Sequence, residues 1–131
     1  MCLVALFTAS DYAEGRTMPY NGESWNDLSK LKPPAAALAK KMLIRGVYEG
    51  AFTTNPDKAR KILVTDKSFE SLVLDLDSFY TDPRNLKIPI GLALRVISME
   101  LQGEPQEVID SYLENLRVFI DETLKKFESV K

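Results

Sequence analysis

The chain has 131 residues, of which 45% are hydrophobic and 27% are charged, and its formal net charge is −2. These values are typical of one folded domain with its own core, and they exclude a chain that is too polar to fold. The slight acidic excess argues against nucleic acid as a partner, because phosphate binding needs a basic surface.

The sequence contains no histidine and a single cysteine, Cys2. The commonest general base and metal ligand is therefore absent, and no internal disulfide or thiolate cluster can form. Asp75, Asp77 and Asp82 lack the spacing of a calcium loop. We find no nucleophile–base pair and no glycine-rich phosphate loop. The sequence therefore predicts a protein that is not an enzyme and that has no catalytic residues, metal or cofactor.

Residues 1–10 begin with seven apolar residues and then change abruptly to polar chain. One interpretation is the remnant of a signal peptide cleaved near Ser10, which implies an exported or periplasmic protein. The other is a short N-terminal segment that packs on the domain of a cytoplasmic protein. No apolar run reaches the roughly 20 residues of a membrane span. Residues 11–131 are expected to form a single helical domain.

The stretch from Ser10 to Ser29 is rich in Gly, Pro, Asn, Asp and Ser, which predicts irregular chain. It contains three aromatic residues, Tyr12, Tyr20 and Trp25. Aromatic side chains in a loop usually pack on the core, because their large apolar area is costly to expose. We expect this for Trp25, and an exposed recognition surface is the alternative.

Helical spacing and capping residues predict helices after this stretch. Their approximate ranges are 34–52, 56–62, 69–80, 89–102 and 105–131. Gly46 and Gly50 lie one turn apart inside the first of them, and each costs about 1 kcal/mol relative to alanine. We expect close packing against another helix to offset that cost.

The helix predicted at 89–102 is apolar on almost every side, so other helices must enclose it. Pro89 is expected at its first position, and Gly103 just after its end. One narrow polar stripe is either a solvent-exposed edge or the opening of a pocket; it comprises Gly91, Arg95, Ser98 and Gln102. The sequence thus predicts an all-α fold, an orthogonal bundle of about four main helices around this central helix.

The last helix carries an apolar stripe at Ile109, Leu113, Leu116, Ile120, Leu124 and Phe127. We expect the stripe to pack within the chain, although such a stripe can also form the seam of a dimer. Leu74 lies on the opposite side of its own predicted helix from the other apolar residues. It indicates a second packing surface or a partner.

The most informative polar cluster is Tyr80, Asp82, Arg84 and Asn85, just before the central helix. In a structural role, Asp82 and Asn85 satisfy backbone groups at the turn and Arg84 pairs with a carboxylate. In a functional role, the cluster binds an anion or a partner next to a helix N-terminus. Together with Trp25 and Arg95, these residues form the candidate binding surface.

Three segments carry a family resemblance: Trp25-Asn26-Asp27-Leu28-Ser29, Gly46-Val47-Tyr48-Glu49-Gly50, and Phe79-Tyr80-x-Asp82-x-x-Asn85-x-x-Ile88-Pro89. With these, the stretch from Trp25 to Leu116 resembles the exported, all-helical bacterial proteins of the Rap/Tai type, which are associated with immunity to type VI secretion toxins. The chain departs from that group in lacking a cysteine pair. The resemblance implies an exported, non-enzymatic protein that acts by binding another protein.

The sequence therefore favours a non-catalytic protein-binding module, exported from a bacterium and immunity-like at best. A cytosolic helical adaptor or a homodimer is the first alternative. A helical pocket for a small molecule is the second.

Overall fold

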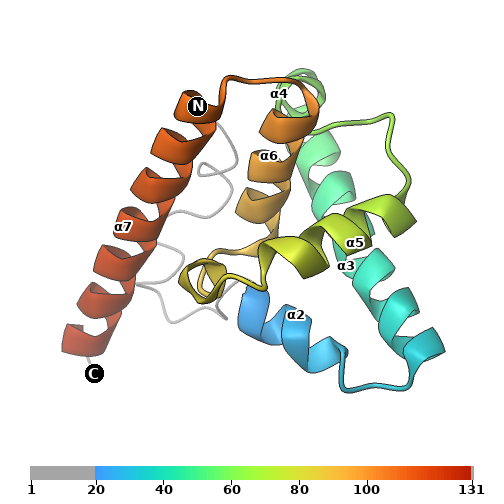
Figure 1. Ribbon diagram of the computed structural model, residues 1–131, viewed down its shortest axis with the longest axis horizontal. Helices are drawn as coiled ribbons and strands as arrows, with labels where there is room; N and C mark the ends of the chain where they lie inside the picture. Colours follow the sequence, from blue (N-terminus) through green and yellow to red (C-terminus); the bar gives the residue numbers. More distant parts are fainter. Residues whose placement is uncertain (1–19, 131) are drawn as a thin grey trace.

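The computed structural model describes residues 20–130, which form an all-α fold (Figure 1). The helices are α2 (Gly22–Leu28), α3 (Pro33–Thr54), α4 (Pro56–Ile62), α5 (Phe69–Phe79), the 3-10 turn η2 (Pro83–Asn85), α6 (Ile90–Leu101) and α7 (Gln106–Val130). Within these residues no strand is present, and Asn21 and Pro89 form an isolated antiparallel bridge. The predicted fold class is confirmed. The candidate signal-peptide remnant, residues 1–10, and Tyr12 lie outside the described residues.

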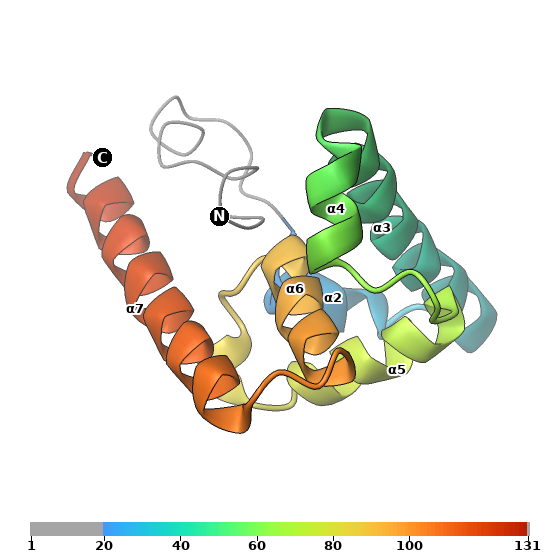
Figure 2. The same cartoon turned by 90° about the horizontal axis from the view of Figure 1, so that it is seen from above.

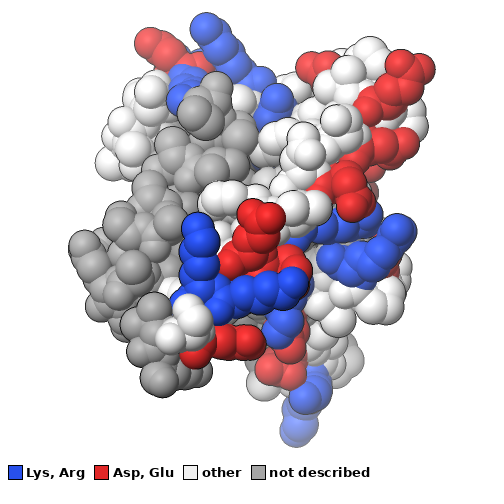
Figure 3. Space-filling model, turned by 90° about the vertical axis from the view of Figure 1, so that its left-hand side faces the viewer, with Lys and Arg blue, Asp and Glu red and all other residues white. Residues whose placement is uncertain are grey.

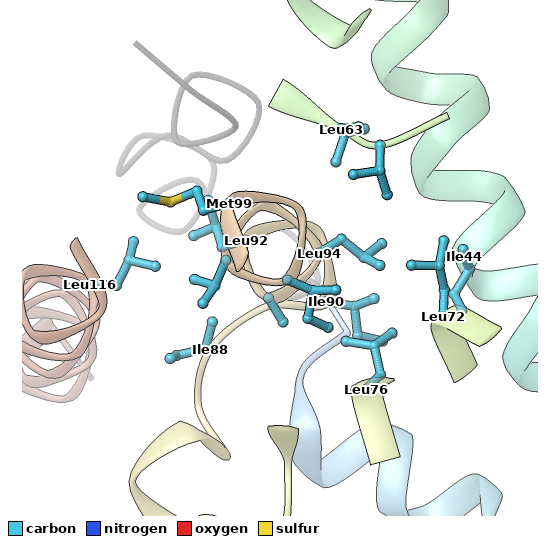
Figure 4. Packing of buried hydrophobic residues seen from close by; sticks show 14 of the residues in the cluster. Ile44, Leu63, Leu72, Leu76, Ile88, Ile90, Leu92, Leu94, Met99 and Leu116 are labelled. Carbon is cyan, nitrogen blue, oxygen red and sulfur yellow. The ribbon is translucent and has the colours of Figure 1, made fainter. Parts of the chain in front are cut away.

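Helix α6 lies at the centre of the molecule, between α7 on one side and α3 with α4 on the other (Figures 1 and 2). Nine of its 12 residues are buried. In Figure 4, Leu116 of α7 faces Leu92 and Met99 of α6, whereas Leu94 points toward Ile44 of α3. This enclosure confirms the predicted role of α6 as the central helix.

The two ends of α6 differ in how well the sequence predicted them. Gly103 has a φ of 77° just after the helix, as expected for a glycine in the left-handed region. Pro89, however, is not the first helical residue, since its ψ of 149° is extended. The isolated bridge holds Pro89 in this conformation, because the next backbone N–H, that of Ile90, donates to the Tyr20 carbonyl at 2.8 Å.

Helix α2 corrects the expectation that the chain up to Ser29 is irregular. The Asn21 side chain caps this helix by accepting hydrogen bonds from the backbone N–H groups of Glu23 and Ser24. Trp25, on the inner face, is 0% exposed. Packing of the indole on the core and the cap at Asn21 together stabilise a helix of only seven residues.

A partly buried polar cluster joins α2, α3 and α5. The indole N–H of Trp25 donates to Oδ1 of Asp77 at 2.8 Å, and the Lys40 ammonium group donates to the same oxygen at 2.7 Å. Lys40 also donates to the Ser29 hydroxyl and lies 5.1 Å from the centre of the Trp25 ring. Because Lys40 is buried, this carboxylate is what makes its charge tolerable inside the fold.

A second contact fixes the other end of α2. The Tyr80 hydroxyl donates to the Ile88 carbonyl at 2.7 Å, and its ring lies directly against Gly22. A Cβ atom at Gly22 would lie 2.7 Å from Cε1 of Tyr80, so only glycine allows this approach.

The polar stripe of α6 has more than one environment. Gly91 borders a groove beside α3 and Gln102 is exposed, whereas the middle of the stripe faces the end of α4. The guanidinium of Arg95 donates to the Ile62 carbonyl, and the Gln102 amide donates to the Lys61 carbonyl. The fully buried Ser98 hydroxyl accepts a hydrogen bond from the backbone N–H of Val64. The stripe thus satisfies backbone groups that the end of a helix leaves free.

The expectation for Gly46 and Gly50 is wrong. Both residues are exposed, and no described atom lies within 4 Å of the position that a Cβ would occupy at either one. Close packing inside the described fold therefore does not offset their cost to α3.

The apolar stripe of α7 packs within the chain, as expected, since Ile109, Leu116 and Ile120 are buried. Leu74 is 69% exposed, which agrees with its predicted place opposite the packed side of α5. Within residues 20–130, no helix is both long and apolar enough to cross a membrane.

The Lys40 cluster generates a stability prediction. We expect Asp77→Ala to lower the free energy of unfolding by about 2 kcal/mol, because it leaves Lys40 and the Trp25 N–H without their shared acceptor. Urea denaturation measures this change. A second variant, Asp77→Ala with Lys40→Met, should recover part of the loss, because no buried charge remains. An Asp77→Ala variant as stable as the wild type would contradict this role.

Candidate binding cleft

A cleft of about 530 Å³ opens between the C-terminal end of α5, η2 and the first half of α7. Its apolar lining residues are Phe79, Ile109 and Leu113, and its charged ones are Asp82, Arg84, Glu100, Asp110, Glu114 and Arg117. Four carboxylates thus face two guanidinium groups. The cleft contains three residues of the predicted site, Asp82, Arg84 and Asn85.

Asp82 and Arg84 form a tight ion pair at one edge of this cleft. Nη2 of Arg84 lies 2.8 Å from Oδ2 of Asp82, and the Arg84 backbone N–H donates to Oδ1 at 2.9 Å. These hydrogen bonds from Arg84 lower the pKa of Asp82 to about 2. Since the folded-state pKa is below the ordinary value, the pair stabilises the fold above the ordinary carboxyl range. That contribution is lost as the pH falls toward about 2.

Arg117 is a residue of the cleft that the sequence analysis missed. Its guanidinium donates to Oδ1 of Asn85 at 2.7 Å and lies 3.5 Å from Oδ2 of Asp82, so it joins α7 to η2. Asn85 in turn donates to the Phe79 carbonyl at 2.9 Å. Arg117 lies on the same face of α7 as Leu113 and Ile120. A charge in the middle of an apolar stripe was the signal that would have identified it.

The opposite edge of the cleft is acidic. Glu100 projects from the end of α6, and its pKa is raised by partial burial and then by the negative charges of Asp75 and Asp110. Asp110 accepts a hydrogen bond from the Gln106 amide at 2.8 Å. No described lysine or arginine forms an ion pair with Glu100 or Asp110. This edge therefore carries negative charge that the described chain does not neutralise.

The other predicted site residues lie elsewhere. Trp25 is buried between α2, α3 and α5, and Tyr80 is 2% exposed, so neither side chain lies on a surface. Arg95 binds the end of α4, on a different side of α6 from Glu100. The structure thus brings Asp82, Arg84 and Asn85 together and separates them from the rest. Asp82 and Arg84 make the contacts that the structural interpretation expects, because they satisfy the turn and each other.

The cleft has the chemical properties of a site for a long cationic side chain. Phe79 and Leu113 offer apolar surface to an aliphatic stem, and Glu100 and Asp110 lie where they can accept hydrogen bonds from its charged end. Within the described residues, no group of three or more acidic or cysteine side chains is arranged to hold a metal ion. Figure 3 views the molecule from the α7 side, where acidic and basic side chains are intermingled over much of the visible surface.

Comparison of the chain with protein-family models, with curated proteins and with solved structures gave no match.

Glu100 generates a prediction about pH. A raised folded-state pKa means that the folded chain holds this proton more tightly than the unfolded chain does, so ionised Glu100 destabilises the fold. We therefore expect Glu100→Gln to raise the melting temperature near pH 7 and to have little effect near pH 3, where the carboxyl is protonated in both states. Thermal denaturation followed by circular dichroism at both pH values measures this.

The matched control is Glu128→Gln, which neutralises an exposed carboxylate near the other end of α7. A melting temperature that falls in Glu100→Gln near pH 7 would mean that the carboxylate stabilises the fold.

Proposed function

We propose that this chain is a non-catalytic protein-binding domain, and that its cleft binds a lysine or arginine side chain of a partner protein. The observation that carries the proposal is the pair Glu100 and Asp110, two carboxylates without a described cationic partner beside an apolar surface. The pKa of Glu100 is raised first by partial burial and then by the negative charges of Asp75 and Asp110, and a partner's cation would offset the second of these causes.

The balance of charge in the cleft supports a basic partner over an anionic one. Arg84 and Arg117 are already engaged by Asp82, Asn85 and Glu114, and so they offer little to an incoming anion. A cationic side chain meets the two unneutralised carboxylates directly. Its aliphatic part covers Phe79 and Leu113, which a bare metal ion cannot do.

The first experiment titrates the isotope-labelled full chain with the peptide acetyl-Leu-Arg-Leu-amide and follows backbone amide resonances by NMR. We expect saturable shifts around Glu100, Asp110 and Leu113, with a dissociation constant of about 1 mM for so short a ligand. The same peptide with citrulline in place of arginine keeps the shape and removes the charge, so it should bind at least tenfold more weakly, on the order of 1.4 kcal/mol. Added salt should weaken binding.

Variants of the protein provide the controls. Glu100→Gln with Asp110→Asn should abolish the shifts, whereas Glu122→Gln with Glu128→Gln removes two exposed α7 carboxylates away from the cleft and should preserve them. Equal binding of the arginine and citrulline peptides, or binding that survives the cleft variant, would contradict the proposal.

The biological setting is part of the same proposal. The resemblance of the Trp25, Gly46 and Phe79 segments to Rap/Tai-type proteins supports an exported bacterial protein that is immunity-like in the broad sense of binding another protein. A cytosolic adaptor or homodimer is the alternative, and a small-molecule pocket is the next one.

The position of the mature N-terminus tests this setting. Fractionation of the source cells and an intact mass should give a chain that begins near Asp11 and lies outside the cytoplasm. A cytoplasmic chain that retains Met1 would contradict export and favour the adaptor or homodimer. The cleft proposal does not depend on this outcome, because it rests on Glu100 and Asp110 alone.

A further inference from the structure

Asn21 and Gly22 form the only Asn-Gly pair in the sequence. Asparagine deamidates most readily before glycine, because glycine has no side chain to hinder attack by its own backbone nitrogen. That nitrogen loses its proton to hydroxide and forms a bond to Cγ of the asparagine, and the side-chain nitrogen leaves as ammonia. The product is a five-membered succinimide ring that joins the two residues.

Water opens this ring in one of two ways. Addition to the former side-chain carbon gives an aspartate with a normal backbone. Addition to the backbone carbonyl carbon gives isoaspartate, in which the main chain runs through the former side chain and is one carbon longer. In both cases water replaces ammonia, so the reaction needs no oxidant and no enzyme. The chemistry makes Asn21 a candidate modification site, and the fold determines when it reacts.

The fold holds both reacting groups in other hydrogen bonds. Oδ1 of Asn21 accepts from the backbone N–H groups of Glu23 at 2.9 Å and Ser24 at 3.2 Å, which fixes the side-chain amide over the first turn of α2. The backbone N–H of Gly22 donates to the Leu86 carbonyl at 2.9 Å. For the ring to close, the amide must leave the cap and the Gly22 nitrogen must lose its proton. Neither step occurs while these bonds are intact.

The surroundings of this pair strengthen the restraint. Gly22 is buried, and a Cβ atom there would lie 2.7 Å from Cε1 of Tyr80, so the aromatic ring covers the glycine closely. On the other side of Asn21, the Ile90 N–H donates to the Tyr20 carbonyl at 2.8 Å. A buried, hydrogen-bonded N–H group gives up its proton to solvent only when its segment opens. Deamidation therefore requires the start of α2 to separate from the chain between η2 and α6.

The isoaspartyl product does not fit the closed fold. Backbone hydrogen bonds lie on both sides of Asn21, one at the Tyr20 carbonyl and one at the Gly22 N–H. An additional main-chain carbon between them puts the two bonds out of register. The Asn21 carbonyl also leaves the main chain, although it accepts the first helical bond of α2 from the Trp25 N–H at 2.9 Å. The aspartate product keeps the backbone and provides an equally good cap.

We propose that Asn21 is a deamidation site controlled by the fold. Closed α2 protects the asparagine, and a chain that forms isoaspartate while α2 is open cannot close α2 again.

The first test compares the full chain in mildly alkaline buffer with and without concentrated urea, by peptide mapping and mass spectrometry over time. Folding should slow the deamidation of Asn21 at least tenfold, because the reaction then waits for a rare opening. A peptide of residues 20–25 in the same two buffers corrects for any effect of urea on the chemistry. In urea, Asn21 should react well before the other asparagines, which are Asn26, Asn55, Asn85 and Asn115.

A variant that stays folded tests the opening itself. Asp77→Ala removes the acceptor of the Trp25 indole N–H and so loosens α2. Deamidation of Asn21 and hydrogen exchange of the Gly22 amide should rise by the same factor, because both need the same opening. The matched control Asp57→Ala, which removes an exposed carboxylate of α4, should change neither rate.

The products themselves provide the last test. Chain aged in urea is refolded, and its aspartate and isoaspartyl forms are separated by chromatography. The aspartate form should melt like the Asn21→Asp variant and close to the wild type. The isoaspartyl form should melt at a lower temperature, and its fluorescence should shift to that of an exposed indole. Trp25 is the only tryptophan, so the fluorescence reports on α2 directly.

Three outcomes would overturn the proposal. The first is deamidation of Asn21 that is as fast in the folded chain as in urea. The second is a reaction at Asn21 in urea that is no faster than at the other asparagines. The third is an isoaspartyl form that melts like the aspartate form. None of these outcomes bears on the peptide titration of the cleft, because Asn21 and Gly22 do not line it.

Discussion

Burial of a helix that has almost no polar side determines the arrangement of the other helices. Only Arg95, Glu100 and Leu101 of the 12 residues of α6 escape burial, so neighbours must cover it from several directions. Helices α3, α5 and α7 supply Ile44, Leu76 and Leu116 to that cover. The loss of any one of these neighbours would expose a continuous apolar surface, and so the bundle is stable only as a whole.

The short helices around α6 end inside or beside the core, so their terminal backbone groups need hydrogen-bond partners there. Side chains provide these partners, and a carboxylate neutralises the one buried charge of the described chain. The carbonyls at the end of α4 receive hydrogen bonds from Arg95 and Gln102, and the buried Lys40 is neutralised by Asp77. The few polar residues on the inner surfaces of these helices therefore act mainly as partners for backbone groups and for one buried charge. This is why Arg95 and Ser98 of α6 resembled part of a functional edge in the sequence and make structural contacts in the fold.

How much the sequence could predict depended on whether the decisive interaction was local. The C-terminal end of α6 follows from Gly103, and the α7 stripe follows from periodicity. The contact between Asp82 and Arg84 lies within a single turn. The conformation of Pro89 and the position of Arg117 depend on long-range contacts. Ile90, next to Pro89, donates to the Tyr20 carbonyl, and Arg117 donates to Asn85. The glycines of α3 were the instructive error. Each glycine does lower the stability of the helix, but the expected close approach of another helix is absent from the described residues.

The acidic edge of the cleft and the outer face of α3 have one physical feature in common. Ionised Glu100 is held beside Asp75 and Asp110, and Gly46 and Gly50 weaken an exposed helix, so both surfaces retain residues that the isolated fold would be more stable without. Such a cost is offset only if something beyond the described residues makes the missing contact.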